Sequence, residues 1–173
     1  MGLDILAYRK LREVPSAHPD DGDKYDLDTY QVISAEVIDD TEANFPGRTA
    51  GLKAGVYTFE EEFSFRAGSY SGYNEWRDNL AWFAFGKGAH EIWADATTKG
   101  PFVELINFSD CEGEIGPIVA AKLAKDFAEH QEKAKTYVPL QNDPDEPDWW
   151  FNLYKDWRKA FEMASDGGSV CFT

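Results

Sequence analysis

The sequence predicts an α+β fold: a mostly antiparallel sheet of four to six short strands with about three helices packed on one side. Short segments rich in β-branched and aromatic residues, separated by loops, predict the strands, and three longer segments with apolar residues at helical spacing predict the helices. Because these helices do not alternate regularly with the strands, a doubly wound parallel sheet is disfavoured. A length of 173 residues suits a single globular domain, 1–173, with a sizeable core.

The predicted strands combine apolar residues with strand-favouring residue types. The segment 30–38 (YQVISAEVI) has the clearest alternation, with Val32 and Ser34 on one face and Gln31 and Ile33 on the other. Apolar density also favours a strand at 102–108 (FVELINF). The other predicted strands lie at 3–11 and 56–65, with a short strand or link at 88–95 and an edge strand at 169–172.

The predicted helices have recognisable end signals. Small polar residues before the first helix suggest Ser71 or Asn74 as its cap, with the helix starting near Tyr73. Proline suits the first turn of a helix and glycine its end. The three helices are therefore placed at 74–85 ending at Gly86, at 118–135 with Gly116 as cap and Pro117 at the first position, and from Pro147 to the glycines 167 and 168.

The loops between these elements show no metal or phosphate motif. The segment 14–28 is rich in aspartate, but its spacing does not match an EF-hand loop. Glycines 47, 51 and 55 do not form a P-loop, because Lys53 is followed by Ala54 rather than by Ser or Thr. The segment 138–148 is predicted to be a linker loop, and the sequence predicts neither a metal nor a cofactor.

The charge balance narrows the classes of partner. The chain carries 32 acidic and 17 basic residues, for a net charge of −15, which disfavours binding to nucleic acid or to anionic membranes. No apolar run approaches the ~20 residues needed to span a bilayer, and the charged N-terminus is unlike a signal peptide. We therefore expect a cytoplasmic protein in which Cys111 and Cys171 are reduced thiols.

Two stretches of mixed polar and aromatic character are the candidate site. The first is 63–77 (FSFRAGSYSGYNEWR) and the second is 104–116 (ELINFSDCEGEIG). Both lie at predicted strand-to-helix junctions, where ligand sites often occur. We expect the two stretches to meet at one water-accessible hollow. The candidate ligand-binding residues are Arg66, Ser69, Tyr70, Tyr73, Asn74, Arg77, Asn107, Ser109, Asp110 and Glu112.

Several of these residues have an alternative structural role. Arg66 and Arg77 suit a ligand carboxylate or phosphate, but in a chain this acidic an internal ion pair with Asp110, Glu112 or Glu114 is favoured for at least one of the two arginines. The rings of Tyr70 and Tyr73, together with Trp76, suit an apolar wall for a ligand. Trp76 is better placed in the core, whereas both roles stay open for Tyr70.

Signals for covalent catalysis are weak. The segment GSYSG (68–72) has Tyr70 where a nucleophile elbow requires serine, and His18, His90 and His130 have no distinctive setting. Cys111 precedes a predicted helix, which lowers a thiol pKa, but the acids on either side of it raise that pKa. A structural thiol is the default interpretation.

At GLDILAY, FRAGSYSGYNEWR, PFVELINFSDCEGEIGP, AAKLAKDFAEH and WRKAFEMASDGG, the chain resembles a family of small hypothetical proteins of bacteriophages and prophages. The resemblance covers most of the chain, but not the acidic loops 15–28 and 143–148. It implies a setting in a phage or the bacterial cytosol. The family has no assigned activity, so the resemblance implies no catalytic residues.

Three functions are compatible with these observations. The first is a phage-associated, non-enzymatic binding module whose polar-aromatic cleft holds a small ligand or peptide. The second is a hydrolase-type enzyme that uses Asp110, Glu112 or Cys111. The third is an acidic decoy protein that binds a basic host partner.

Overall fold

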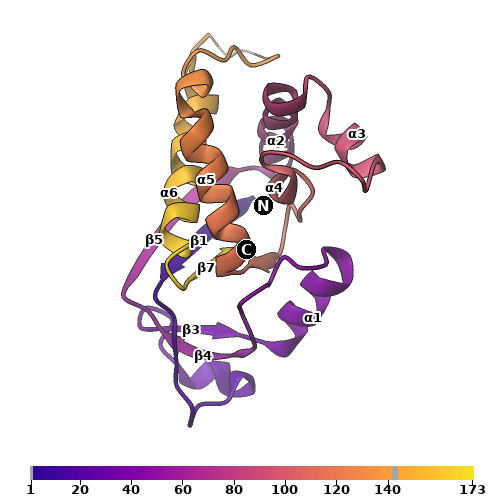
Figure 1. The fold of residues 1–173 in the computed structure, drawn as a ribbon. Helices are drawn as coiled ribbons and strands as arrows, with labels where there is room; N and C mark the ends of the chain where they lie inside the picture. Colours follow the sequence, from indigo (N-terminus) through magenta and orange to yellow (C-terminus); the bar gives the residue numbers. More distant parts are fainter. Residues whose placement is uncertain (1, 142–143) are drawn as a thin grey trace.

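The computed structural model describes residues 2–141 and 144–173 and has an α+β fold built on two antiparallel sheets. The larger sheet has the strand order β5-β1-β7-β6. Helices α5 and α6 stand side by side against one face of it (Figure 1). These elements are β1 Leu3–Arg9, β5 Glu61–Gly68, β6 Gly113–Ile115, β7 Ser169–Phe172, α5 Pro117–Ala134 and α6 Trp149–Ala164.

The smaller sheet lies below the larger one in Figure 1 and has the order β2-β4-β3. Strand β2 follows β1 closely and β4 precedes β5 closely, so the pairing of β1 with β5 continues into the pairing of β2 with β4. The elements of this region are β2 Arg12–Glu13, the 3-10 helix η1 Pro19–Lys24, β3 Tyr30–Ile33, α1 Ala35–Asn44 and β4 Gly55–Thr58.

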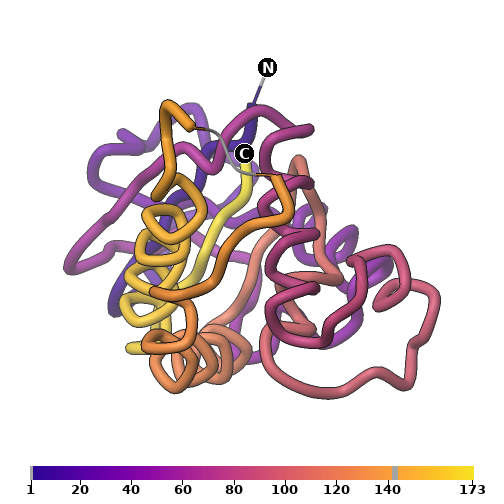
Figure 2. Tube along the Cα trace, turned by 90° about the horizontal axis from the view of Figure 1, so that it is seen from above, coloured from indigo at the N-terminus to yellow at the C-terminus, as the bar shows by residue number. Residues whose placement is uncertain are grey.

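Three further helices lie beside α5 on the other side of the molecule (Figures 1 and 2): α2 Tyr70–Phe85, α3 Ala89–Ala94 and α4 Val103–Ile106. Helix α2 contacts α6 through aromatic side chains. Trp76 of α2 stacks on Trp150 and Trp157 of α6, with ring centroids 6.3 and 5.7 Å apart. The indole N–H groups of Trp76 and Trp150 donate to each other's backbone carbonyls at 3.1 and 3.3 Å. All three tryptophans are buried, so Trp76 belongs to the core.

The strand predicted at 30–38 is half wrong. Strand β3 ends at Ile33, and helix α1 begins directly after Ser34. The Ser34 hydroxyl accepts a hydrogen bond from the Val37 N–H at 3.1 Å, which caps the helix. Polar and apolar residues continue to alternate after Ser34. Most of these residues are exposed, however, so they do not form the buried face of a strand.

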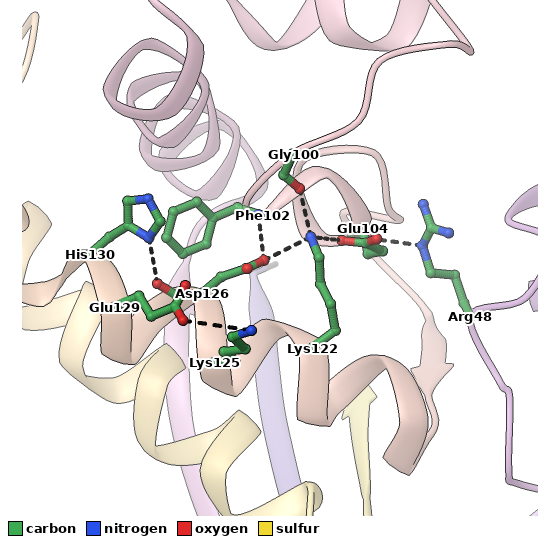
Figure 3. Close-up of polar contacts among 9 residues, drawn as sticks. All are labelled: Arg48, Gly100, Phe102, Glu104, Lys122, Lys125, Asp126, Glu129 and His130. Atoms are coloured by element: carbon green, nitrogen blue, oxygen red, sulfur yellow. Dashed lines mark hydrogen bonds and ion pairs between the residues drawn. The ribbon is translucent and has the colours of Figure 1, made fainter.

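The strand predicted at 102–108 is also wrong, because this segment contains helix α4. Phe102, just before α4, has a positive φ of 63°, and its N–H donates to the Asp126 carboxylate on α5 at 2.8 Å (Figure 3). That contact directs the chain into a helical turn. The short strand or link predicted at 88–95 is helix α3, whose first turn is closed by a bond from the Gly88 N–H to Glu91 Oε2 at 3.0 Å.

Other boundaries differ by smaller amounts. The cap of α2 is Ser69, whose hydroxyl accepts from the Gly72 N–H at 3.1 Å, so neither Ser71 nor Asn74 fills that position. The helix predicted from Pro117 is confirmed. Strand β7 exists as predicted, but it is central rather than at an edge, because it pairs with both β1 and β6.

The predicted linker 138–148 is irregular over 138–141 and 144–148, and residues 142–143 of it lie outside the described residues. Over the ranges that the structure describes, no helix is both long enough and apolar enough to cross a bilayer.

Candidate functional site

The two predicted stretches meet through side chains of α2. Asn74 Nδ2 donates to Asp110 Oδ2 at 2.7 Å. The Arg77 guanidinium donates to the Phe108 carbonyl and to Asn74 Oδ1. Asn74 therefore connects the charge of Arg77 to the carboxylate of Asp110. This contact joins the second turn of α2 to the loop that precedes β6.

Arg77 is held inside the molecule rather than presented to solvent. Its side chain is 4% exposed. The guanidinium carbon lies 5.1 Å from the ring centroid of Tyr73 and 4.8 Å from that of Trp93, at cation–π distance. Within the part of the chain that the structure describes, Arg77 has no carboxylate within ion-pair distance. The expected direct pair with Asp110 is therefore replaced by the link through Asn74.

Arg66 takes a different partner from those considered in the sequence. Its Nη1 contacts both carboxylate oxygens of Asp4, at 3.1 and 3.0 Å, across the β1–β5 pair. Both side chains are about half exposed. Arg66 therefore belongs to the solvent-facing surface of the larger sheet, and it does not join the Asn74–Asp110 contact.

The aromatic residues of the first stretch divide between core and surface. Tyr73 is fully buried, and this burial raises the pKa of its hydroxyl group. Tyr70 is half-buried and packs against the core from the first turn of α2. Ser69 caps this helix, and its hydroxyl lies 3.1 Å from that of Ser71. Because Tyr73 is fully buried, its ring cannot line a ligand site that is open to solvent.

The second stretch borders a hollow of about 330 Å³ between α1 and the loop 109–113. Ser109 Oγ organises this loop, because it accepts from the N–H groups of Cys111 and Glu112 at 3.2 and 3.0 Å. Cys111 is exposed, and its Sγ lies 3.6 Å from Ser109 Oγ. The lining residues are Val37, Asp40, Thr41, Asn44, Phe45, Ser109, Cys111, Glu112 and Gly113. None of them is a histidine, so this hollow supplies no imidazole base for Cys111.

Asn107 lies apart from these groups. Its backbone carbonyl accepts from Arg48 Nη2 at 3.0 Å, and the residue borders a separate hollow of about 250 Å³ beside α3 and α4. It therefore does not share a cavity with the other predicted residues of its stretch.

The largest of these hollows, about 490 Å³, receives residues from the first stretch. One wall is Ala67, Gly68, Gly72 and Glu75, where β5 turns into α2. The other wall comes from the start of α6 and the loop before it: Gln141, Pro144, Glu146, Trp149 and Leu153. Each of the three hollows thus takes residues from only one of the two predicted stretches, so the hollow that the two stretches were expected to share is not found among them.

Sequence reasoning missed the wall formed by α6. Trp149 and Leu153 are four residues apart and therefore lie on one face of the helix. The signal was present as a tryptophan directly after an acidic, proline-containing segment.

A second feature that the sequence did not reveal is the burial of Glu114, which is 2% exposed. Its Oε1 accepts from Gln31 Nε2 of β3 at 3.2 Å, and its N–H donates to Thr41 Oγ1 of α1 at 3.3 Å. Ser169 and Cys171 of β7 also face the carboxyl group. Burial raises the pKa of Glu114 to about 7. This carboxyl group lies at the junction of the two sheets.

Over residues 2–141 and 144–173, no group of three or more His, Cys, Asp or Glu residues is arranged to hold a metal ion. Comparison of the chain with protein-family models, with curated proteins and with solved structures finds no match.

Proposed function

We propose that this chain is a non-enzymatic binding module, and that the 490 Å³ hollow between the start of α2 and the start of α6 holds a cationic small ligand or a basic peptide side chain. The observation that carries the proposal is the composition of this hollow. It combines two carboxylates, an indole and an aliphatic side chain around a floor of small residues. A phage or bacterial cytosolic setting is part of the proposal.

The size and the lining of the hollow support this function. Ligand pockets in proteins have volumes of about 300–1,000 Å³ and join apolar walls to a few polar groups. Trp149 and Leu153 supply the apolar wall, and both are half-buried against the core. Gly68 and Gly72 carry no side chain that would fill the opposite side. The shape therefore suits a narrow, partly apolar group.

The charge of the hollow supports a cation. Glu75 and Glu146 line it, and in the described part of the chain neither carboxylate forms an ion pair. Tryptophan is the best aromatic partner for an ammonium or guanidinium group. The net charge of −15 attracts cations over longer distances. A ligand that places its cation between these groups therefore satisfies charges that the protein leaves unpaired.

Titration with lysine amide, arginine amide and a hexalysine peptide, followed by NMR of the tryptophan indole N–H signals, tests this function. We expect the Trp149 indole signal to shift with saturation, while the buried Trp76 signal stays in place. Glutamate and acetate serve as anionic controls. No saturable shift at Trp149 with any of the three cationic probes would contradict the proposal.

A matched pair of variants locates the effect. The double variant E75Q/E146Q removes both charges from the hollow and is expected to weaken binding at least tenfold, which corresponds to about 1.4 kcal/mol. The variant E129Q removes an exposed carboxylate of α5 outside the hollow and is expected to bind as the wild type does. Equal weakening by both would mean that only net charge matters, as in the acidic decoy function.

A further inference from the structure

Strand β5 forms one outer edge of the larger sheet (Figure 1). Its inner edge pairs with β1 in an unbroken register from Arg9↔Glu61 to Asp4↔Arg66, and after a register shift at Ala67 the pairing ends at Leu3↔Gly68. Over the ranges that the structure describes, no backbone group pairs with the outer edge of β5. An open edge of this length is a template for a further strand.

The register shows which residues of β5 point their backbone groups outward. Asp4 and Thr173 exchange both backbone hydrogen bonds, at 2.9 and 3.0 Å, so the even-numbered residues of β1 bond to β7 and its odd-numbered residues bond to β5. Ile5 and Ala7 are opposite Phe65 and Phe63. The backbone groups alternate in direction along a strand. Those of Glu62, Ser64 and Arg66 therefore point outward.

The side chains of β5 alternate in the same way. Phe65 packs edge-on against Trp157 of α6, and Lys159 lies over the ring of Phe63. The two phenylalanines are therefore on the helix-covered face. Glu62, Ser64 and Arg66 are on the opposite face, and all three are exposed.

This edge is complementary to itself in an antiparallel arrangement centred on Ser64. In that register Ser64 faces Ser64 of the second copy, and Glu62 faces Arg66 at both ends of the contact. The outward backbone groups of all three residues are then opposite one another, as a hydrogen-bonded antiparallel pair requires. Phe63 of each copy faces Phe65 of the other, and both rings are only half-buried in one copy.

We propose that two copies of this chain join through β5 as a two-fold symmetric dimer, with one continuous eight-stranded sheet and reciprocal Glu62–Arg66 pairs. A two-fold contact uses the same patch on both copies, as this register does. Opposite charges and aromatic pairs directly across two strands both favour the pairing. The partner that fits this edge is therefore a second copy rather than an unrelated strand.

The net charge of each copy opposes the association. Two chains of net charge −15 repel each other at low salt, and the repulsion is screened within about 10 Å at 0.1 M salt. We therefore expect the dimer fraction to increase when salt is raised from low to physiological concentration. The reciprocal pairs act at contact distance and select the register.

Sedimentation equilibrium of the wild type and three variants tests the dimer. S64P removes one outward N–H from each copy, and proline is tolerated at an edge strand when its N–H faces solvent. We expect S64P to be monomeric and to keep the circular dichroism spectrum of the wild type. F65P removes an N–H that points toward β1, so it is expected to lower the melting temperature. This contrast shows that S64P acts on the edge and not on the fold.

A mixing experiment tests the register. E62K alone places lysine opposite arginine, and R66E alone places glutamate opposite glutamate, so each variant is expected to be monomeric. In a mixture of the two, both pairs become attractive, and we expect a one-to-one dimer. A monomeric wild type, a dimeric S64P variant or a failure of the mixed variants to associate would each overturn the proposal.

Discussion

Asp126 on α5 and Glu114 on β6 are both buried carboxylates, with 8% and 2% exposure, but the protein holds them in opposite ways. Asp126 Oδ2 accepts a hydrogen bond from the Phe102 N–H at 2.8 Å and forms an ion pair with Lys122 Nζ at 2.8 Å. Lys122 also contacts Glu104 Oε2 and the Gly100 carbonyl at 2.6 Å each (Figure 3). A cation and a backbone amide therefore compensate the charge of Asp126.

Glu114 has no such compensation. In the described part of the chain, no cation lies within ion-pair distance of its carboxyl group, and its hydrogen-bond partner Gln31 is uncharged. Among the described residues, its Oε2 has no hydrogen-bond partner. The comparison shows that burial alone does not determine the role of a carboxyl group. Asp126 is an acceptor that joins neighbouring elements, whereas Glu114 has a raised pKa. The partners of each carboxyl group determine its role.

The largest effect is expected from Asp126→Ala. This change leaves the buried Phe102 N–H without its acceptor and removes one of the two carboxylates that contact Lys122, and we expect it to lower the free energy of unfolding by about 3 kcal/mol. Urea denaturation followed by tryptophan fluorescence measures the change. The control is Glu129→Ala on the next turn of the same helix, where an exposed pair with Lys125 is worth less than about 0.5 kcal/mol. Equal losses of unfolding free energy for the two variants would contradict the role of Asp126 as the partner of the Phe102 N–H and of Lys122.

The next effect concerns the pH dependence that Glu114 imposes. Its folded pKa of about 7 lies above the ordinary glutamate value of 4.5, so the folded state binds the proton more tightly than the unfolded state. The wild type is therefore expected to lose stability as pH rises from 4.5 to about 7, and no more above it. The total amounts to about 3 kcal/mol, at about 1.4 kcal/mol for each unit of pKa.

Glu114→Gln isolates this contribution, because glutamine keeps the size of the side chain and does not titrate. We expect the difference in unfolding free energy, variant minus wild type, to grow between pH 4.5 and 7 in favour of the variant. Chemical denaturation at closely spaced pH values gives the difference curve. A difference that is constant with pH would show that Glu114 does not titrate in this range.

A smaller loss of unfolding free energy is expected for changes at Asn74. Its uncharged side chain connects Arg77 to Asp110, so its contribution is expected to be smaller than that of the buried carboxylates. Asn74→Ala removes both hydrogen bonds and should lower the unfolding free energy by about 1–2 kcal/mol. Asn74→Asp keeps an acceptor for Arg77 but places a carboxylate beside Asp110. It should therefore be destabilising as well, and more so at low salt than at high salt.

The smallest effect is one of reactivity rather than stability. Cys111 is exposed, whereas burial and the neighbouring Glu114 raise the pKa of the Cys171 thiol. Because the thiolate is the reactive form, iodoacetamide should label Cys111 first in the folded protein and reach Cys171 only on unfolding. Peptide mass spectrometry after timed labelling measures the two rates. Equal rates in the folded state would place Cys171 at the surface.

The sequence predicted those features that depend on neighbouring residues. The start of α5 was predictable, since Gly116 and Pro117 are local signals. Helix α4 was not, because FVELINF suits either a strand or a helix, and the Asp126 contact that directs it comes from another element. The contact between Asn74 and Asp110 joins the two stretches that residue type had singled out. The second wall of the largest hollow lies too far along the chain to be predicted from those stretches.

The position of β7 has a consequence for how the protein is made. Strand β7 lies between β1 and β6, yet its residues, 169–172, follow both of those strands in the chain. During synthesis the ribosome therefore releases both neighbours long before the strand that must join them. The larger sheet cannot close until this segment has left the exit tunnel, so until then the nascent chain exposes the strand edges of β1 and β6 that β7 later covers.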